Sequence, residues 1–188
     1  FDSAELPRAE LTHLLRSKAV LMPGVVVSFA DEKTKAAQTW QYKGGLADYL
    51  MQSVPAEPLI PLFEGEHYAE EGEAENNAEG EGAAWCVAFT EDGATLRESY
   101  VNLIPTVAGG THEAGLKDGL FAAVKGFIDL HSLLPKGVKL MPEDVFSRAS
   151  FVLSAKVLDP QFQGQTKDRL NSRDALRLVA NYTRPAFE

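Results

Sequence analysis

Cysteine is nearly absent from this chain of 188 residues, in which Cys86 is the only one. A single cysteine excludes an internal disulfide framework and a cysteine metal cluster. We expect Cys86 to be a buried thiol in a strand, which fits a reducing, cytoplasmic setting. No apolar run approaches the length that spans a membrane, and the mixed polar and charged N-terminal residues predict no signal peptide.

Recognised nucleotide and metal motifs are missing as well. The chain contains no glycine-rich dinucleotide fingerprint, no P-loop lysine and no HExxH zinc motif. His13, His67 and His131 show no metal-ligand spacing, and the position of His131 near a helical apolar stripe favours a core histidine. The sequence therefore holds no self-sufficient nucleotide pocket, and we predict no metal site in it.

Negative charge dominates, with a formal net charge of −9, but it is unevenly distributed. Eight glutamates and no lysine or arginine lie within residues 64–82, and they account for all but one unit of the net charge. This low-complexity stretch predicts a disordered, solvated surface insert, with metal binding and DNA mimicry as alternative interpretations. Since the rest of the chain is close to neutral, charge neither supports nor excludes a nucleic-acid partner. Lys117 and Lys125 share a predicted helix face, for which a solvated polar surface is favoured over contact with a DNA backbone.

Hydrophobic periodicity and turn residues predict alternating helices and strands. Helices are expected at residues 1–18, 46–51, 113–132, 142–149 and 173–182, and strands at residues 25–29, 39–42, 85–89, 95–103 and 151–157. A short turn between strands 85–89 and 95–103 predicts a hairpin. Strand 151–157 alternates apolar and polar residues, which predicts burial of one face. The order of elements is typical of an α+β fold built from helix and sheet layers.

The stretch from Asp159 to Leu170 connects the last predicted strand to the last predicted helix. It contains Gln163, Gln165 and Lys167, together with a glycine and a threonine. A short loop between two rigid elements can present one cation and several hydrogen-bond donors to an anionic ligand. This stretch is therefore the candidate phosphate-binding loop of the chain.

A second candidate site precedes the helix predicted at residues 113–132. It consists of Gly109, Gly110, Thr111 and His112. Free backbone N–H groups at a helix start can bind an anion, but the favoured interpretation is a tight turn at the glycines and a helix cap from the Thr111 side chain. His112 is disfavoured as a catalytic base, because no nucleophile motif accompanies it and no carboxylate can be assigned to orient it.

Several blocks of the sequence resemble one protein family. DPQFQGQTK at residues 159–167 resembles the QTK loop in the B subunits of bacterial type II DNA topoisomerases, which are gyrase and topoisomerase IV. Further blocks similar to this family are SYVNLIPT at 99–106, GGTH at 109–112, LTHLLRSKAVLMPGV at 11–25, and LPKGVKL with the Glu-Asp-Val that follows it, at 134–145. The last of these resembles topoisomerase IV more than gyrase, whereas the acidic insert matches no pattern of the family.

The resemblance implies a domain organisation and a site. Residues 1–43 would be the C-terminal helix and strands of a GHKL ATPase domain, and residues 44–188 a transducer domain with the ribosomal protein S5 domain 2-like fold. Lys167, in a catalytic role, and Gln165 would contact the γ-phosphate of ATP. A cation there offsets charge on the transferred phosphoryl group and makes domain orientation depend on that phosphate. The groups that bind adenine and Mg²⁺ would lie upstream, so the isolated chain is expected to be inactive.

The resemblance also implies partners, and other functions of the chain stay open as alternatives. The expected partners are DNA, a second B subunit in a homodimer and the topoisomerase IV A subunit in a heterotetramer, with no membrane, in the bacterial cytoplasm at the nucleoid. ATP binding would close a gate on the DNA segment that is transported. The alternatives are the transducer of gyrase, an S5-fold nucleic-acid-binding module without an ATPase role, a GHKL protein of the mismatch-repair or chaperone type, and a non-enzymatic scaffold.

Overall fold

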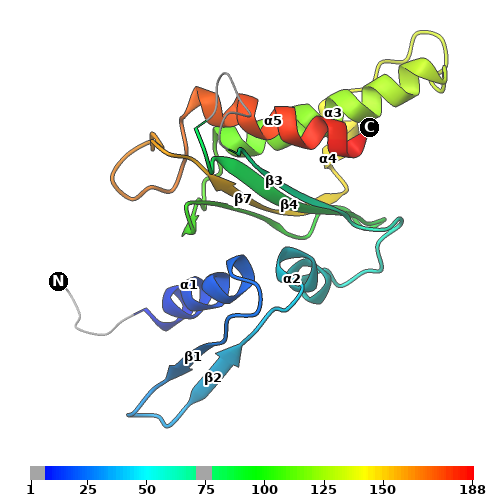
Figure 1. Cartoon of the computed structure of the whole chain (residues 1–188). Helices are drawn as coiled ribbons and strands as arrows, with labels where there is room; N and C mark the ends of the chain where they lie inside the picture. Colours follow the sequence, from blue (N-terminus) through cyan, green and yellow to red (C-terminus); the bar gives the residue numbers. More distant parts are fainter. Residues whose placement is uncertain (1–6, 71–77) are drawn as a thin grey trace.

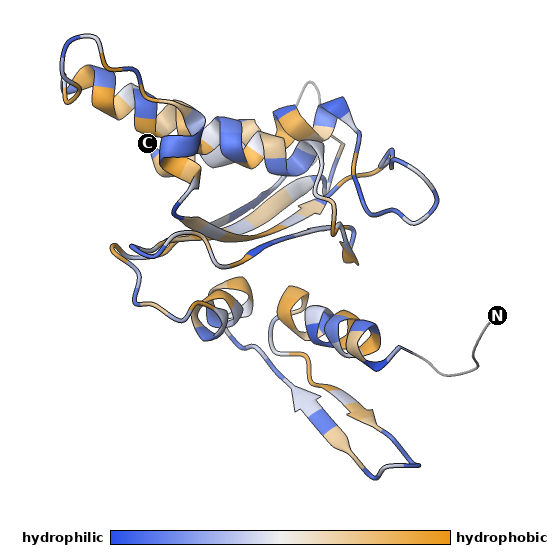
Figure 2. Ribbon diagram, turned by 180° about the vertical axis from the view of Figure 1, so that it is seen from behind, coloured by the Kyte–Doolittle hydropathy of each residue, from blue (hydrophilic) through white to orange (hydrophobic). Residues whose placement is uncertain are grey.

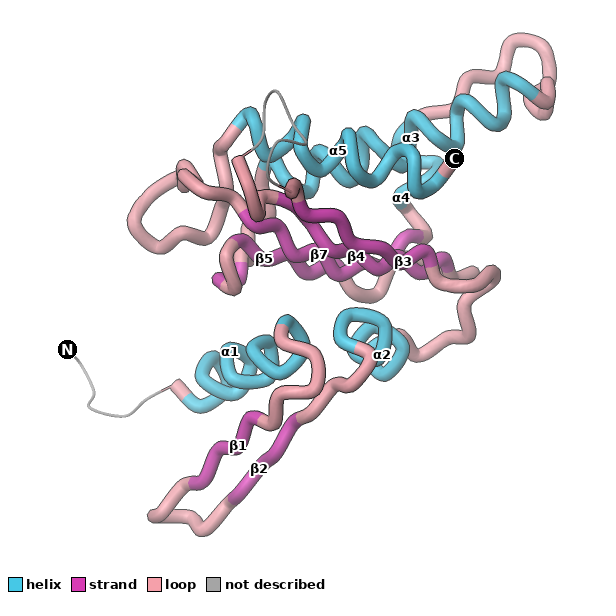
Figure 3. Tube along the Cα trace, viewed as in Figure 1, coloured by secondary structure: helices cyan, strands magenta, loops and turns pink. Residues whose placement is uncertain are grey.

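Helices cover both faces of a five-stranded sheet in the computed structural model, which describes residues 7–70 and 78–188 (Figure 1). The strands are β1 (Val27–Ala30), β2 (Ala37–Trp40), β3 (Phe63–Tyr68), β4 (Gly82–Phe89), β5 (Arg97–Val101), β6 (Ile104–Pro105) and β7 (Ala149–Lys156), and the helices are α1 (Arg8–Leu21), α2 (Gly45–Ser53), α3 (Thr111–Leu130), α4 (Pro142–Phe146) and α5 (Arg173–Phe187). Helices α3 and α5 lie on one face and α1 and α2 on the other, with β1 and β2 as a separate hairpin (Figure 3). The mixed helix and sheet architecture predicted from the sequence is confirmed.

The strand order β3-β4-β7-β5-β6 differs from the predicted hairpin. β7 lies between β4 and β5, antiparallel to β4 and parallel to β5, so that Phe151 pairs with Val87 on one side and with Arg97 on the other. The prediction that β7 buries one face was also wrong, because its side chains are buried between both helix layers. A strand buried on both faces occupies the centre of a sheet, and this displaces β4 from β5.

One apolar core lies between the sheet and the helices α3 and α5. These helices pack closely, because a Cβ atom at Gly115 would lie only 2.4 Å from the Leu176 carbonyl oxygen. Leu116 of α3 and Leu178 of α5 are buried against the sheet, and each such side chain stabilises the fold by about 1.5–3 kcal/mol. This layer fixes α5, and with it the C-terminal end of the candidate loop.

A second apolar core lies between the opposite face of the sheet and the helices α1 and α2. Val20 of α1, Leu50 of α2 and Val152 of β7 belong to it, as does Cys86. Burial raises the pKa of the Cys86 thiol to about 12, and the expected buried strand cysteine is confirmed. The N-terminal residues therefore share a core with the sheet.

A polar cluster joins the same elements. The hydroxyls of Tyr49 and Tyr100 donate to the carboxylate of Glu98, at 2.8 and 2.7 Å. Arg16 of α1 donates to the Tyr42 hydroxyl at 2.7 Å, and its guanidinium carbon lies 5.0 Å from the centre of the Tyr49 ring. Burial, followed by the charge of Glu98, raises the pKa of both Tyr49 and Tyr100, which keeps them as neutral hydrogen-bond donors.

Part of the predicted disordered insert, residues 64–82, forms a strand. Residues 64–68 belong to β3, which pairs with β4 from Phe63 opposite Val87 to Tyr68 opposite Gly82. Exposed glutamates alternate there with partly buried residues, and the Phe63 ring packs against that of Phe187 with 5.4 Å between the ring centres. The acidic composition concealed this alternation of period two. Residues 71–77, the middle of the predicted insert, lie outside the described residues.

His131 does not lie in the core as predicted. It follows the last turn of α3 and is exposed, with its ring 4.3 Å from that of Phe127. The end of α3 extends beyond the sheet (Figure 1), so the apolar stripe continues into solvent at Phe127 and Leu130. Within residues 7–70 and 78–188, no helix has both the length and the apolar character needed to span a membrane.

Candidate functional site

The predicted phosphate-binding loop, residues 159–170, belongs to the connection between β7 and α5, residues 157–172, which projects beyond the end of β7 (Figure 1). Its residues are largely hydrophilic (Figure 2), and the side chains from Gln163 to Lys167 are exposed. The loop is thus open to a ligand or a neighbouring domain. The predicted strand, loop and helix are present in the expected order.

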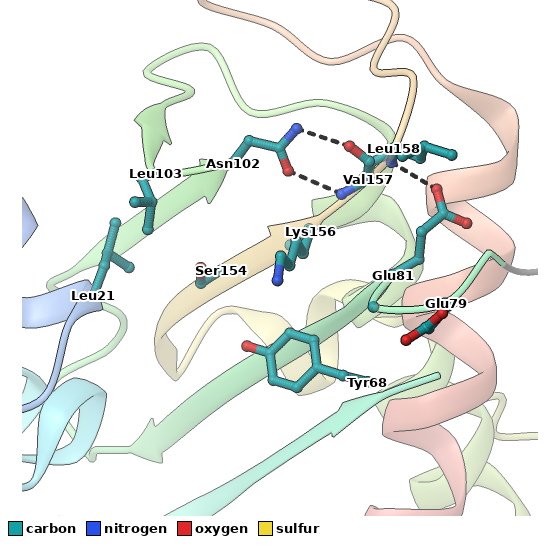
Figure 4. A pocket seen from close by; sticks show the side chains of 12 residues that line it. Leu21, Tyr68, Glu79, Glu81, Asn102, Leu103, Ser154, Lys156, Val157 and Leu158 are labelled. Carbon is teal, nitrogen blue, oxygen red and sulfur yellow. Dashed lines mark hydrogen bonds between the residues drawn. The ribbon is translucent and has the colours of Figure 1, made fainter. Parts of the chain in front are cut away.

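Side chains from two other elements hold the beginning of the loop (Figure 4). Asn102, in the turn between β5 and β6, donates from its side-chain amide to the Val157 carbonyl oxygen at 2.7 Å and accepts from the Val157 N–H at 3.0 Å. Glu81, before β4, accepts from the N–H of Leu158 at 2.7 Å. The first two residues after β7 are therefore attached to the segments next to the neighbouring strands β5 and β4.

The end of the loop is closed by hydrogen bonds between its own two halves. The Asn171 N–H donates to the Gln161 carbonyl oxygen at 2.7 Å, and the Gln163 N–H donates to the Arg169 carbonyl oxygen at 2.8 Å. The Ser172 hydroxyl accepts from the N–H of Gln161 at 2.8 Å. This ladder leaves residues 164–168 as the projecting tip.

The Gly109–Gly110 turn contacts the same loop. Leu170 donates to the Gly109 carbonyl oxygen and accepts from the Thr111 N–H, both at 3.1 Å. Gly110 has φ of 144°, and a Cβ atom there would lie 2.3 Å from the Leu170 carbonyl oxygen, so no other residue fits without movement. The structure thus joins the two stretches that the sequence identified as candidates.

The start of α3 does not form the anion cradle considered from the sequence. The Thr111 N–H is used by Leu170, and Glu113 places a carboxylate in the first helical turn. The predicted side-chain cap from Thr111 was wrong, because Gly110 occupies the cap position and the Thr111 hydroxyl has no hydrogen-bond partner among the described residues. The other part of the favoured interpretation, a tight turn at the glycines, is confirmed, because Gly109 and Gly110 have φ of 67° and 144°.

Lys167 lies at the projecting tip in a left-handed backbone conformation, with φ of 59°. Its ammonium nitrogen is 5.8 Å from the centre of the Phe162 ring, and within the described part of the chain no carboxylate forms an ion pair with it. Gln165, two residues earlier, is also exposed. An unpaired cation beside an amide donor can bind an anionic group that another domain or ligand brings to the loop.

His112 belongs to a buried polar chain that the sequence did not reveal. Its Nε2 lies 2.9 Å from the Thr106 hydroxyl, which lies 2.7 Å from the Ser99 hydroxyl, and Ser99 donates to the Glu113 carboxylate at 2.6 Å. Burial lowers the pKa of His112 to about 4, so its ring is neutral at neutral pH. His112 is fully buried, so its ring does not face solvent. Only the polar residues of the SYVNLIPT block could have indicated the cluster.

The lysines considered for DNA contact have local partners. Lys125 pairs with Asp129 one turn later, and the Lys117 ammonium lies 5.9 Å from the centre of the Phe146 ring. Lys125 is exposed, as the interpretation as a solvated helix surface expects, whereas Lys117 is half-buried. Among the described residues no group of three or more His, Cys, Asp or Glu could hold a metal ion.

Comparisons with curated proteins identify relatives over the whole chain. The family model of DNA gyrase B matches residues 45–188. The B subunit of DNA topoisomerase 4 from Pseudomonas aeruginosa is 44% identical over 190 aligned residues, covering 100% of this chain and 29% of that protein. The B subunit of DNA gyrase from Helicobacter pylori is 34% identical over 95% of the chain and 22% of its own length. The chain thus spans less than a third of the length of these relatives.

Solved structures agree with this assignment. The topoisomerase IV ATP-binding domain of Francisella tularensis matches with a TM-score of 0.74 and 33% identity, over 98% of this chain and 48% of that one. The B subunit of DNA gyrase from Myxococcus xanthus shares the fold, with a TM-score of 0.76 and 22% identity over 100% of this chain and 51% of that one. On these matches the chain belongs to the DNA gyrase B family, whose members include the B subunits of topoisomerase 4 and gyrase.

Proposed function

We propose that this chain is the transducer region of an ATP-dependent type II DNA topoisomerase, of the topoisomerase IV kind. Lys167 and Gln165 contact the γ-phosphate of ATP that is bound by an upstream GHKL domain. The observation that carries the proposal is the presentation of Lys167, which is exposed, unpaired with a carboxylate in the described residues, and set at the tip of a loop anchored at both ends. The identity of 44% to a topoisomerase 4 protein, against 34% to a gyrase protein, supports the topoisomerase IV assignment.

The residues present fit one part of an ATP site. A lysine ammonium and a glutamine amide are donors that suit phosphate oxygens, whereas the described residues contain no cluster suited to Mg²⁺. When bound, ATP and Mg²⁺ supply the phosphoryl group and neutralise its charge. In this chain, Lys167 stabilises negative charge at the γ-phosphate, and Gln165 orients the same group through a hydrogen bond.

The anchoring of the loop explains how phosphate contact is transmitted. Leu170 ties the loop to the start of α3, and Asn102 ties its beginning to the β5–β6 turn. A displacement of Lys167 would therefore move the start of α3 and the β5–β6 turn with it, because hydrogen bonds connect the loop to both. We assign to this linkage the coupling of ATP binding to domain movement and DNA passage.

The domain boundary between residues 43 and 44 is part of the proposal. A family model that begins at residue 45 supports it. The preceding α1, β1 and β2 would complete the ATPase domain, and the sheet with α3 and α5 would be the S5 domain 2-like transducer. DNA, a second B subunit and an A subunit are the partners that this function requires.

The decisive experiment is Lys167→Ala in a full-length protein that contains this chain. We expect a loss of ATP hydrolysis of at least tenfold, because removal of one charge-stabilising donor costs about 10²–10³ in rate in comparable sites. Lys139→Ala, which removes an exposed lysine from the connection between α3 and α4, is the matched control and should leave hydrolysis unchanged.

Hydrolysis close to that of the unaltered protein in the Lys167→Ala variant would overturn the role of this residue. Circular dichroism of both variants checks that the fold is kept. The isolated chain should hydrolyse no ATP, and turnover by the pure chain would contradict the division into an upstream nucleotide pocket and a sensing loop.

A further inference from the structure

Strand β3 leaves one edge of the five-stranded sheet open (Figure 3). It is the outermost strand in the order β3-β4-β7-β5-β6, and β4 is its only neighbour among the strands of the described residues. The pairing with β4 is regular over all six residues of β3, which contains no proline. A regular strand at the edge of a sheet offers its outer main-chain groups to a further strand.

The outward main-chain groups of β3 belong to Glu64 and Glu66. The Ala69 N–H donates to the Glu81 carbonyl oxygen at 2.8 Å, which continues the ladder between β3 and β4. Residues of an antiparallel strand direct their N–H and C=O groups alternately to the two sides, so those of Gly65 point to β4 and those of Glu64 and Glu66 point away. Within residues 7–70 and 78–188, these outward groups form no backbone hydrogen bond.

The side chains of the same two residues are exposed and negatively charged. They point to the face of the sheet that bears α1 and α2, because Glu64 lies opposite Cys86, which belongs to the core on that face. Neither carboxylate forms an ion pair or a side-chain hydrogen bond in the described parts of the chain. Cationic side chains two positions apart on an added strand can therefore pair with Glu64 and Glu66.

An apolar groove of about 300 Å³ lies beside the two carboxylates. Its apolar lining residues are Val20, Leu21 and Pro23 at the end of α1, and Leu46 and Ala47 in α2. The methylene stems of lysine and arginine cover apolar surface while their charged ends stay in a polar environment. The edge of β3 thus favours long basic side chains on the added strand.

Charge disfavours a second copy of the chain at this edge. In two β3 strands related by a twofold axis, outward-directed residues lie opposite outward-directed residues. The registers with the greatest overlap therefore bring Glu64 opposite Glu66, or Glu66 opposite its own copy. Like charges directly opposite each other destabilise a strand pair, whereas opposite charges stabilise it. A basic partner is favoured over self-pairing for this reason.

We propose that the outer edge of β3, at residues 63–66, binds an extended segment of a partner protein in which lysine or arginine occupies every second position. The segment adds an antiparallel strand, its main chain pairs with Glu64 and Glu66, and its basic side chains reach the two carboxylates across the apolar groove. The site lies at the opposite edge of the sheet from the β5–β6 turn, so it does not depend on the proposed ATP contact.

The first test titrates the 188-residue chain with the peptide TKVKVKT, blocked at both ends, and records amide NMR spectra and hydrogen exchange. The largest shifts should lie at Glu64 and Glu66. Exchange of these two N–H groups should slow by about tenfold or more in the complex, whereas that of Gly65, which already faces β4, should change little. Unchanged exchange at both glutamates, or largest shifts on another element, would overturn the proposal.

Two further peptides separate charge from strand pairing. TEVEVET reverses the charges and should bind about tenfold or more weakly. TKVKVKT with methyl groups on the backbone nitrogens of its lysines keeps the charges but lacks the N–H groups that face β3. It should bind about fivefold or more weakly, which is the value of one net hydrogen bond. Affinity of TEVEVET equal to that of TKVKVKT would refute the recognition of basic residues, and equal affinity of the methylated peptide would refute the added strand.

Substitutions in the chain test the location. Glu64→Gln with Glu66→Gln removes both charges and should weaken TKVKVKT binding by about threefold or more, since each cross-strand charge pair contributes about 1.4-fold to fivefold. Glu10→Gln with Glu32→Gln removes the same charge from exposed positions in α1 and in the β1–β2 turn, and should bind as the unaltered chain does. An equal loss in both double variants would indicate attraction to the net charge alone and would contradict a site on β3.

The unaltered chain without peptide tests the choice of partner. Its exchange at Glu64 and Glu66 should be independent of protein concentration, because self-pairing is disfavoured by charge. Slower exchange at these two residues with rising concentration would assign the edge to a second copy of the chain and overturn the basic partner.

Discussion

The contact between Gly110 and Leu170 makes a quantitative prediction about the coupling of α3 to the candidate loop. In Gly110→Ala, the new Cβ would lie 2.3 Å from the carbonyl oxygen and 2.6 Å from the nitrogen of Leu170. These are backbone atoms that cannot rotate away. The loop must therefore move as a unit, or α3 must start differently.

The magnitude follows from two contributions. A non-glycine residue at φ of 144° and ψ of −159° costs about 1–3 kcal/mol in backbone strain. Displacement of the loop breaks the hydrogen bonds of Leu170 to Gly109 and Thr111, and of Asp168 to Ala108, each worth about 1 kcal/mol net. We expect the free energy of unfolding to fall by about 4–6 kcal/mol in total.

Urea unfolding of the 188-residue chain measures this difference, and Gly126→Ala is its matched control. Gly126 lies in the same helix, and a Cβ there would contact nothing within 4 Å. This control should be more stable than the unaltered chain by about 0.5–1 kcal/mol, because alanine favours a helix over glycine. A loss below about 1 kcal/mol in Gly110→Ala would refute the close packing of the turn against the loop.

Two further predictions concern buried titratable groups. The pKa of His112 is lowered from 6.5 to about 4. Between pH 6.5 and about pH 4, the unfolded chain therefore binds a proton at His112 that the folded chain does not. The free energy of unfolding falls as the pH is lowered through this range, and the loss approaches about 3 kcal/mol near pH 4. Urea unfolding at several pH values should show a shallower loss in His112→Gln, and equal pH dependence of both proteins would contradict the buried neutral histidine. Cys86 should resist a thiol reagent such as Ellman's until urea unfolds the chain, because burial raises its pKa to about 12; labelling at the rate of a free thiol in the native protein would disprove its burial.

The elements that the sequence predicted well are those whose patterns are local. Helix α3 was predicted within two residues at each end, and β7 within the same margin, because their apolar periodicity lies within a single stretch of chain. The strand β3 was missed because its apolar positions alternate with glutamates that resemble a solvated insert. The predicted hairpin failed because a turn between two strands does not exclude the insertion of a third strand from later in the chain.

In the candidate site, too, the residues with local patterns could be predicted and those with long-range contacts could not. Lys167 and Gln165 could be selected from their neighbours in sequence, since a cation and donors in a loop between a strand and a helix form a local pattern. The anchors of that loop could not, because Asn102 meets Val157 across 55 positions and Glu81 meets Leu158 across 77. Their selection depends on strand order, which no local pattern contains.

Residue types and their spacing were enough to predict a lysine-bearing loop between a strand and a helix and a buried lone thiol, because both are local patterns. The tertiary structure alone decided that β7 separates β4 from β5, that the Gly109–Gly110 turn holds the loop at Leu170, and that β3 forms an edge of the sheet. These features depend on contacts between distant segments, whose free energies are set by packing and hydrogen bonding in three dimensions rather than by neighbours along the chain.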